Sequence, residues 1–295
     1  MGGQKIEAFL QYTINGIITG LIYSLVALGF NIIYSTTKIV NFAQGEFVML
    51  GAMLQFYFLT LHIPIILGFT LSAIIVGVVG YTIHTVFIRG AKKPDELALI
   101  VLTIGIAMIL RGASMLLFGK NAHAVKQFLP FDSITIFGLT FSSQYIVVFA
   151  GTVIFATLLF IFFNKTNSGK VMMASSNNPL ACRLFGIDVE QVQAFSFLIS
   201  GMLGAIGGSI IAPISFAKYN MGLIMGLKGF SASVVGGFGN NVGAIAGGLI
   251  IGISESLAAG YISSSYKDIV AFLIMILVLF IKPSGIFGAK DIERV

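Results

Sequence analysis

Phe47–Ile88 reads FVMLGAMLQFYFLTLHIPIILGFTLSAIIVGVVGYTIHTVFI, and these 42 residues contain no Asp, Glu, Lys or Arg. A helix that spans the hydrocarbon core of a membrane needs about 20 apolar residues, so this stretch is long enough for two crossings. We place the break at His62-Ile63-Pro64, because proline is favoured in the first turn of a helix. The sequence therefore predicts one span over Phe42–Leu61 and a second over Pro64–Ile88.

The composition of the whole chain agrees with a membrane protein. Of its 295 residues, 57% are hydrophobic and 9% are charged, whereas soluble domains carry about 25% charged residues. The net charge of +6 does not indicate a nucleic-acid partner, because the basic residues form no patch or stripe. A single cysteine, Cys182, excludes an intramolecular disulfide, and the three histidines lie far apart in the sequence. We expect no metal and no cofactor.

The same length criterion, applied outward, gives six further spans and one short segment. The stretch Met221–Tyr261 contains eleven glycines, and we treat it as apolar throughout, divided by the sequence GGFGNN. We therefore predict an all-α integral membrane protein, a polytopic bundle of about eight full spans plus one interrupted segment, in a single domain over 1–295. The additional full spans are Tyr12–Tyr34, Leu97–Phe118, Gln144–Phe163, Ala194–Phe216, Val242–Gly260 and Ser263–Ile281, and the interrupted segment is Gly222–Val235.

The distribution of Lys and Arg predicts the orientation, because short cytoplasmic loops carry an excess of both. If Gly222–Val235 crosses the membrane, ten basic residues outside the spans lie on one side and five on the other, which places the C-terminus in the cytoplasm. If that segment only re-enters, the C-terminal tail moves to the other side and the bias is lost. The ten are Lys38, Arg89, Lys92, Lys93, Lys165, Lys170, Arg183, Lys282, Lys290 and Arg294; the five are Lys5, Lys120, Lys126, Lys218 and Lys267.

Four pairs of glycines are spaced four residues apart within three spans. This spacing lets helix backbones approach closely in lipid, so the pairs predict a tightly packed bundle. The pairs are Gly16/Gly20, Gly204/Gly208, Gly243/Gly247 and Gly248/Gly252.

No enzyme motif is found in the sequence. A P-loop requires Gly-Lys followed by Ser or Thr, but the two Gly-Lys pairs are followed by Asn121 and Val171. A recognisable pairing of nucleophile and base is also missing. We expect a pore, a transporter or a membrane scaffold that does not itself hydrolyse ATP.

Three ionisable residues lie inside the expected spans, where they are costly and tend to face a cavity or a partner. They are Glu46, Arg111 and Glu255. Glu46 ends the polar junction Asn41–Glu46, which is either a broken helix that lines a pathway or an ordinary turn with an acidic residue at a helix N-terminus. Arg111 either lines the pathway, reaches towards the interface, or pairs with Glu255.

The segment Asn164–Gln193 is a polar insert of 30 residues between two spans. Pro179 at a first turn and Gly186 at a C-cap predict a helix of two turns. Such a helix serves either as a docking element for a soluble partner or as an interfacial helix on lipid.

Four segments of the chain form a recognisable set: GLIYSLVALGFNIIYSTTKIVNFAQGEFVMLGA (Gly20–Ala52), GKVMMASSNNPLACRLFGIDVEQVQAFSFLISGMLGAIGG (Gly169–Gly208), GGFGNNVGAIAGGLIIGISES (Gly236–Ser256) and KPSGIFG (Lys282–Gly288). Together, and in this order, they resemble the shorter permease subunit of the branched-chain amino acid ABC importers. The chain departs from the family pattern at Gln44, where many relatives have His, and in lacking a literal Glu-Ala-Ala coupling signature.

The resemblance implies a bacterial inner-membrane complex of two related permeases, two ATPase subunits and an extracytoplasmic binding protein. It implies that residues 164–193 couple to the ATPases, with the contact formed by Ala174, Asn178, Pro179, Ala181, Arg183 and Gly186. Joined to the polar residues above, it implies a translocation pathway that includes Asn41, Gln44, Gly45, Glu46, Arg111 and Glu255.

Three alternatives stay open at this point. A urea or short-amide permease uses nearly the same architecture. An ion-coupled secondary transporter would need several paired acidic residues at mid-membrane. A structural membrane subunit would need no pathway at all.

Overall fold

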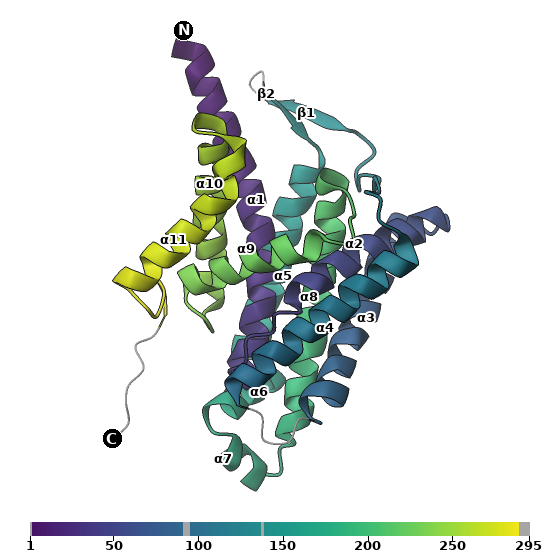
Figure 1. The fold of residues 1–295 in the computed structure, drawn as a ribbon, viewed down its shortest axis with the longest axis vertical. Helices are drawn as coiled ribbons and strands as arrows, with labels where there is room; N and C mark the ends of the chain where they lie inside the picture. Colours follow the sequence, from purple (N-terminus) through teal and green to yellow (C-terminus); the bar gives the residue numbers. More distant parts are fainter. Residues whose placement is uncertain (1, 91–94, 137–138, 289–295) are drawn as a thin grey trace.

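The structure is a computed structural model that describes residues 2–90, 95–136 and 139–288. Helices dominate the described residues, and one short hairpin accompanies them (Figure 1). In chain order the elements are α1 (Gly2–Thr37), α2 (Gln44–Thr60), α3 (Ile65–Thr82), the π-helix η1 (Ile83–Ile88), α4 (Glu96–Phe118), β1 (Ser133–Ile136), β2 (Leu139–Ser142), α5 (Gln144–Lys165), α6 (Asn167–Asn177), α7 (Pro179–Leu184), α8 (Val189–Ser215), α9 (Met221–Gly236), α10 (Asn241–Tyr261), the 3-10 helix η2 (Ser264–Tyr266) and α11 (Lys267–Ile281).

The expected all-α membrane architecture is confirmed. Within the described residues, seven helical segments are long and apolar enough to cross a membrane. The number of full spans is smaller by one than the eight predicted, because α2, predicted as a span over Phe42–Leu61, has only 17 residues; α9, predicted as a short segment, has 16. At about 1.5 Å per residue, these two helices are near 25 Å long and fall short of a hydrocarbon core of about 30 Å.

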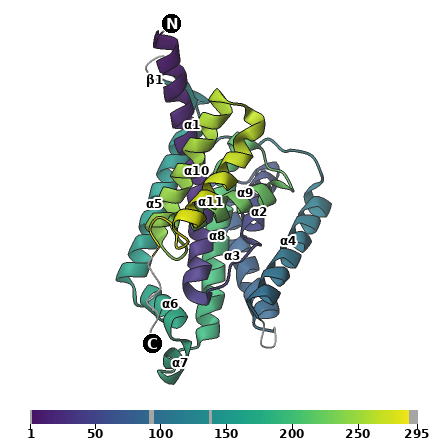
Figure 2. The same ribbon diagram turned by 60° about the vertical axis from the view of Figure 1, so that its left-hand side comes forward.

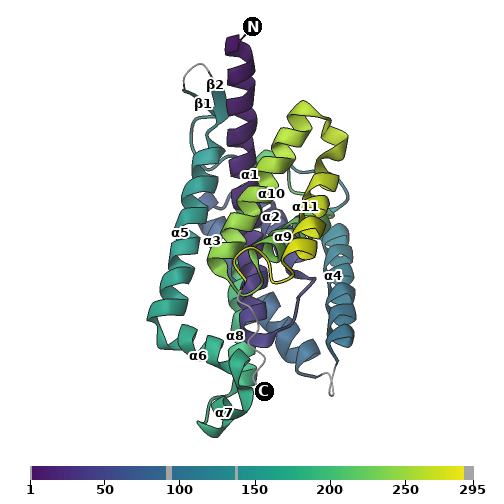
Figure 3. The same cartoon turned by 90° about the vertical axis from the view of Figure 1, so that its left-hand side faces the viewer.

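The helices form a bundle with two distinct ends (Figure 1). The N-terminus of α1 and the β1–β2 hairpin lie at one end, and α6 and α7 lie at the other. Figures 2 and 3 show α4 at the periphery of the bundle, while α1, α2, α8, α9 and α10 form its interior. The fully buried large side chains, among them Phe30, Phe47, Phe197 and Ile251, come from these interior helices.

Glycine pairs bring the interior helices together, as the sequence predicts. On α1, a Cβ at Gly20 would meet the backbone of Gly248 on α10, and a Cβ at Gly252 would meet the backbone of Gly16 and Gly20 in return. On α8, a Cβ at Gly208 would collide with the carbonyl of Val48 on α2. Close backbone contact of this kind is what small residues permit between helices in lipid.

The short segment predicted over Gly222–Val235 is confirmed as the continuous helix α9, and the break falls within the sequence GGFGNN, as predicted. In this break, Gly237 and Gly239 take φ values of 100° and 84° that favour glycine. The C-terminal segment then covers the end of α9: Ile286 N donates to Val235 O at 2.9 Å. This bond satisfies a backbone carbonyl that would be costly to leave unpaired inside a membrane.

Three details of the structure were not predicted. Helix α8 begins at Val189, five residues before the predicted start, because the Asp188 side chain accepts from the backbone N–H groups of Glu190 and Gln191 and caps the helix. The hairpin between α4 and α5 was not expected, and the span after Pro64 ends in a π-helical turn. Four basic residues used for the orientation lie outside the described residues: Lys92, Lys93, Lys290 and Arg294.

Candidate functional site

Glu46 and Arg111 form an ion pair inside the bundle. Glu46 lies in the first turn of α2 and is 1% exposed, and Arg111 comes from α4. Arg111 Nε donates to Glu46 Oε1 at 3.1 Å, and Nη2 contacts the same oxygen. Glu46 Oε2 is buried and has no hydrogen-bond partner among the described residues. The interpretation that Arg111 pairs with Glu255 is therefore wrong.

This ion pair lies on a cavity of about 400 Å³ between α4 and α9. Apart from the carboxylate and the guanidinium, the walls consist of apolar side chains and glycines. The lining residues are Phe30, Phe42, Glu46, Ile104, Ala107, Met108, Arg111, Gly222, Leu223, Gly226 and Leu227. One anion and one cation on an apolar wall match a small zwitterion that carries an apolar group.

The other polar residues of the Asn41–Glu46 junction face the protein interior instead of this cavity. Asn41 Oδ1 accepts from Ala43 N at 3.1 Å, which closes the turn before α2. Gln44 is fully buried, and it accepts from Ser200 Oγ at 2.6 Å and donates to Ser200 O at 3.2 Å.

Gly45 is also a packing position, since a Cβ there would collide with the carbonyl of Gly222 on α9. The junction is thus a broken connection between α1 and α2 that delivers Glu46, and not Asn41 or Gln44, to the cavity wall.

Glu255 belongs to a second buried cluster, which sequence reasoning missed because it treated the stretch around Lys228 as apolar. Lys228 is 2% exposed, and its Nζ pairs with Glu255 Oε1 and lies 2.5 Å from Asp268 Oδ1. Tyr23 OH donates to Glu255 Oε2 at 2.9 Å. Asp268, in the first turn of α11, turns towards Lys228 although about half of its side chain is exposed. A lone lysine in a glycine-rich apolar run was the available signal.

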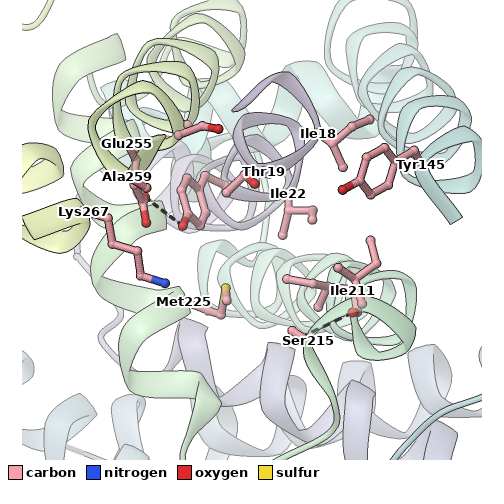
Figure 4. Close-up of a pocket in the computed structure, with 14 residues that line it drawn as sticks. Ile18, Thr19, Ile22, Tyr145, Ile211, Ser215, Met225, Glu255, Ala259 and Lys267 are labelled. Atoms are coloured by element: carbon pink, nitrogen blue, oxygen red, sulfur yellow. Dashed lines mark hydrogen bonds between the residues drawn. The ribbon is translucent and has the colours of Figure 1, made fainter. Parts of the chain in front are cut away.

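Glu255 lines a different cavity from Glu46. This cavity of about 300 Å³ lies among α1, α5, α8, α9, α10 and α11 (Figure 4). The predicted pathway residues therefore divide between two places: Glu46 and Arg111 on one side of α9, and Glu255 on the other.

The short helix that Pro179 and Gly186 predict is confirmed as α7. The Asn178 side chain caps it by accepting from Ala181 N at 3.0 Å, Pro179 occupies its first turn, and Gly186 follows with a φ of 78°. Arg183 is exposed, as are Ala174, Asn178, Pro179 and Gly186, while Ala181 is half-buried. These residues share the end of the bundle formed by α6 and α7 (Figure 1), far from either cavity.

The chain is similar to known membrane transport proteins. The family described as "Branched-chain amino acid transport system / permease component" matches residues 12–279. The high-affinity branched-chain amino acid transport system permease protein BraD of Pseudomonas aeruginosa is 30% identical over 306 residues, covering 99% of each chain.

A relative from a second organism is equally similar in sequence, and one solved structure is similar in fold. The probable branched-chain amino acid transport permease protein LivH of Methanocaldococcus jannaschii is 30% identical over 300 residues, covering 93% of each chain. The solved structure described as PsaBC from Streptococcus pneumoniae in complex with Fab has a similar fold, with a TM-score of 0.50 at 16% identity over 96% of the present chain and 97% of the other.

Proposed function

Because this chain belongs to the family of branched-chain amino acid transport permeases, we propose that its cavity at Glu46 and Arg111 is the part of the translocation pathway that receives a branched-chain amino acid. The chain is a multi-pass membrane transport permease, and its family places it in an ABC transport system. The cavity is the single observation that carries the proposal.

The chemistry of the cavity fits a zwitterion with a branched apolar side chain. Arg111 has five N–H donors, of which the Glu46 contact uses those on Nε and Nη2, so donors remain for a carboxylate. Glu46 Oε2 lacks a partner among the described residues and can accept from an ammonium group. The apolar walls, including Ile104, Met108 and Leu223, surround the remaining space.

The same walls separate this substrate class from urea or a short amide. Urea has no apolar part, so the apolar side chains of the cavity would lie against it without gaining the free energy of burying hydrocarbon, about 25 cal/mol per Å². Leucine, isoleucine and valine each bring a branched hydrocarbon group that gains this term. The composition of the wall therefore favours the amino acids.

The partners are part of the proposal. We infer a second related permease, two ATPase subunits that dock on α6 and α7, and an extracytoplasmic binding protein at the opposite end of the bundle. Large apolar side chains at the tip of α7 support the docking: Leu180, Leu184 and Phe185 are 69%, 81% and 85% exposed. Exposed apolar residues gathered in one place are typical of interaction surfaces. This arrangement puts α7 in the cytoplasm, and we propose the same side for the C-terminus.

The test is leucine uptake by the assembled importer that carries Glu46→Gln. A carboxylate that only favours a helix N-terminus contributes about 0.3–1 kcal/mol, so its loss would leave uptake nearly unchanged. A carboxylate that contacts the substrate in the pathway should cost at least about tenfold in rate, or about 1.4 kcal/mol. We expect the larger effect when uptake is expressed per amount of assembled complex.

Glu190→Gln is the matched control, because Glu190 pairs with Arg89 near the surface with 40% of its side chain exposed. It should leave uptake within a factor of about two, as surface pairs contribute about 0–1 kcal/mol. If the Glu46→Gln importer takes up leucine as fast as the control variant, Glu46 is not part of the pathway. If the unmodified importer takes up urea faster than leucine, the substrate class is urea and short amides instead of branched-chain amino acids.

A further inference from the structure

The cavity that Glu255 lines (Figure 4) lies across α9 from the Glu46–Arg111 pair. Met225 lines this second cavity, and the next residue, Gly226, lines the first. Helix α9 is therefore a wall shared by two cavities. Each of them is built with one carboxylate, one basic side chain and apolar surface.

The second cavity lies towards the end of the bundle that carries the N-terminus of α1. Tyr145 is the second residue of α5, Ser215 is the last of α8, and Lys267 is the first of α11. These helix ends face away from α6 and α7 (Figure 1). If α7 docks on an ATPase, this cavity lies in the outer half of the permease.

The charges around the cavity are arranged in two separate groups. In the first, Glu255 and Asp268 share the single ammonium of Lys228, so the cluster carries a surplus of one negative charge. The hydroxyl of Tyr23 holds the remaining oxygen of Glu255 in place. In the second group, Lys267 extends its amino group towards the cavity (Figure 4) and forms no salt bridge with any described residue.

The rest of the lining is apolar, with a few hydroxyl groups. Ile18, Ile22, Ile211 and Ile214 supply hydrocarbon, and Ser256 adds a hydroxyl oxygen that remains able to accept a bond after donating to Tyr12 O. The volume of about 300 Å³ lies at the lower end of the range for ligand pockets, about 300–1,000 Å³. The cavity therefore fits one small amino acid and not a peptide.

We propose that this cavity is a second binding site for a zwitterionic amino acid with an aliphatic side chain, on the outer side of α9. Lys267 holds the carboxylate, and the ammonium faces the Glu255, Lys228 and Asp268 cluster. The aliphatic side chain lies against Ile22, Ile211 and Met225. The amino acid class rests on the proposed function, whereas the site itself rests on the geometry of this cavity.

The test places a thiol in the cavity wall and measures its protection. Ala259 lines the cavity and is half-buried, so Ala259→Cys in a Cys182→Ser background gives one reporter in the assembled importer. We expect saturating leucine to slow alkylation of this thiol. Leucinamide, which lacks the carboxylate, and 4-methylpentanoate, which lacks the ammonium, should not slow it. Absence of protection by leucine would overturn the proposal.

Lys267→Gln in the same background tests the carboxylate contact. It should raise the leucine concentration that gives half-protection at least about tenfold, or about 1.4 kcal/mol. Lys218→Gln is the matched control, because Lys218 is an exposed lysine in the connection between α8 and α9 and lies outside the lining of this cavity. Equal half-protection in both variants would contradict the role of Lys267.

Two further arms separate this proposal from its alternatives. Protection that appears without leucine in vesicles containing phosphatidylethanolamine, but not in vesicles of phosphatidylglycerol alone, would assign the cavity to a lipid headgroup and overturn the amino acid. Protection should also survive Glu46→Gln, whose uptake measurement tests the first cavity. If leucine does not protect the thiol but Glu46→Gln lowers uptake as expected, only the second site is ruled out. If leucine protects the thiol but Glu46→Gln leaves uptake unchanged, only the first site is ruled out.

Discussion

Arg111 Nε lies 3.1 Å from Glu46 Oε1, although the two residues are 65 positions apart in the chain. The contact joins the peripheral helix α4 to the start of α2. Only 28% of the most apolar 18-residue stretch of α4 is buried within the bundle. A second contact between the two segments is the hydrogen bond that Phe42 N donates to Thr103 Oγ1 at 3.2 Å. The ion pair therefore positions α4 as well as lining the cavity.

Arg111→Gln should destabilise the permease, because it leaves the buried Glu46 carboxylate without its cation. Breaking a buried pair costs about 3–5 kcal/mol because one charge is left uncompensated, and replacing both partners removes that charge. We expect a clear fall in the thermal unfolding midpoint for Arg111→Gln and recovery in the double variant Glu46→Gln/Arg111→Gln. Leucine uptake should stay low in both. A double variant as unstable as the single one would show that Arg111 stabilises the fold through other contacts.

Lys228→Met should lower the amount of folded permease more than any exposed lysine does. It leaves Glu255 and Asp268 as two neighbouring carboxylates without their shared cation, and like charges in a site of low polarity repel strongly. Detergent-solubilised protein measured by size-exclusion chromatography is the readout. Adding Glu255→Gln should restore part of the yield. Lys218→Met is the control and should match the unmodified chain.

Gly186→Val and Arg183→Glu should uncouple ATP hydrolysis from uptake while the permease still inserts. Gly186 has a φ of 78° that a β-branched residue adopts only with strain, so the connection after α7 should shift. Arg183→Glu reverses the charge of an exposed side chain on α7. Leucine uptake and ATPase rate are measured on the same preparation.

Gly119→Val is the control for backbone strain, since Gly119 has a similar φ of 85° at the end of α4. It should leave the ratio of uptake to hydrolysis unchanged. A normal ratio in both α7 variants would place the ATPase contact elsewhere.

The orientation can be checked with two exposed positions at opposite ends of the bundle. Cys182 is only 6% exposed, so it is a poor reporter and is replaced by Ser. Ala122→Cys should then react with an impermeant thiol reagent added to intact cells. Phe185→Cys should react only after the membrane is opened, because the excess of basic residues keeps the α6–α7 end in the cytoplasm. The opposite pattern would invert the permease.

The local elements of this protein could be predicted from its sequence, because lipid imposes a local requirement. An apolar run must reach about 20 residues to cross the membrane, and Pro64 and Gly186 mark boundaries that depend only on backbone geometry. The glycine pairs also predicted close packing from local sequence, because residues four positions apart lie on the same face of a helix and that face then carries no bulky side chains. The short helix α9 was predicted to within one residue at each end, because the glycine-rich sequence GGFGNN permits the positive φ values of Gly237 and Gly239 that follow it.

The candidate site was decided by tertiary structure. The sequence indicated that Glu46, Arg111 and Glu255 were unusual. It did not indicate their partners: Arg111 pairs with Glu46, Lys228 joins Glu255 to Asp268, and Gln44 forms a hydrogen bond with Ser200. Each of these contacts joins different helices, and its partners are between 27 and 156 positions apart. A buried charge requires some partner, but which partner it meets depends on how the helices pack, and only the folded bundle determines that.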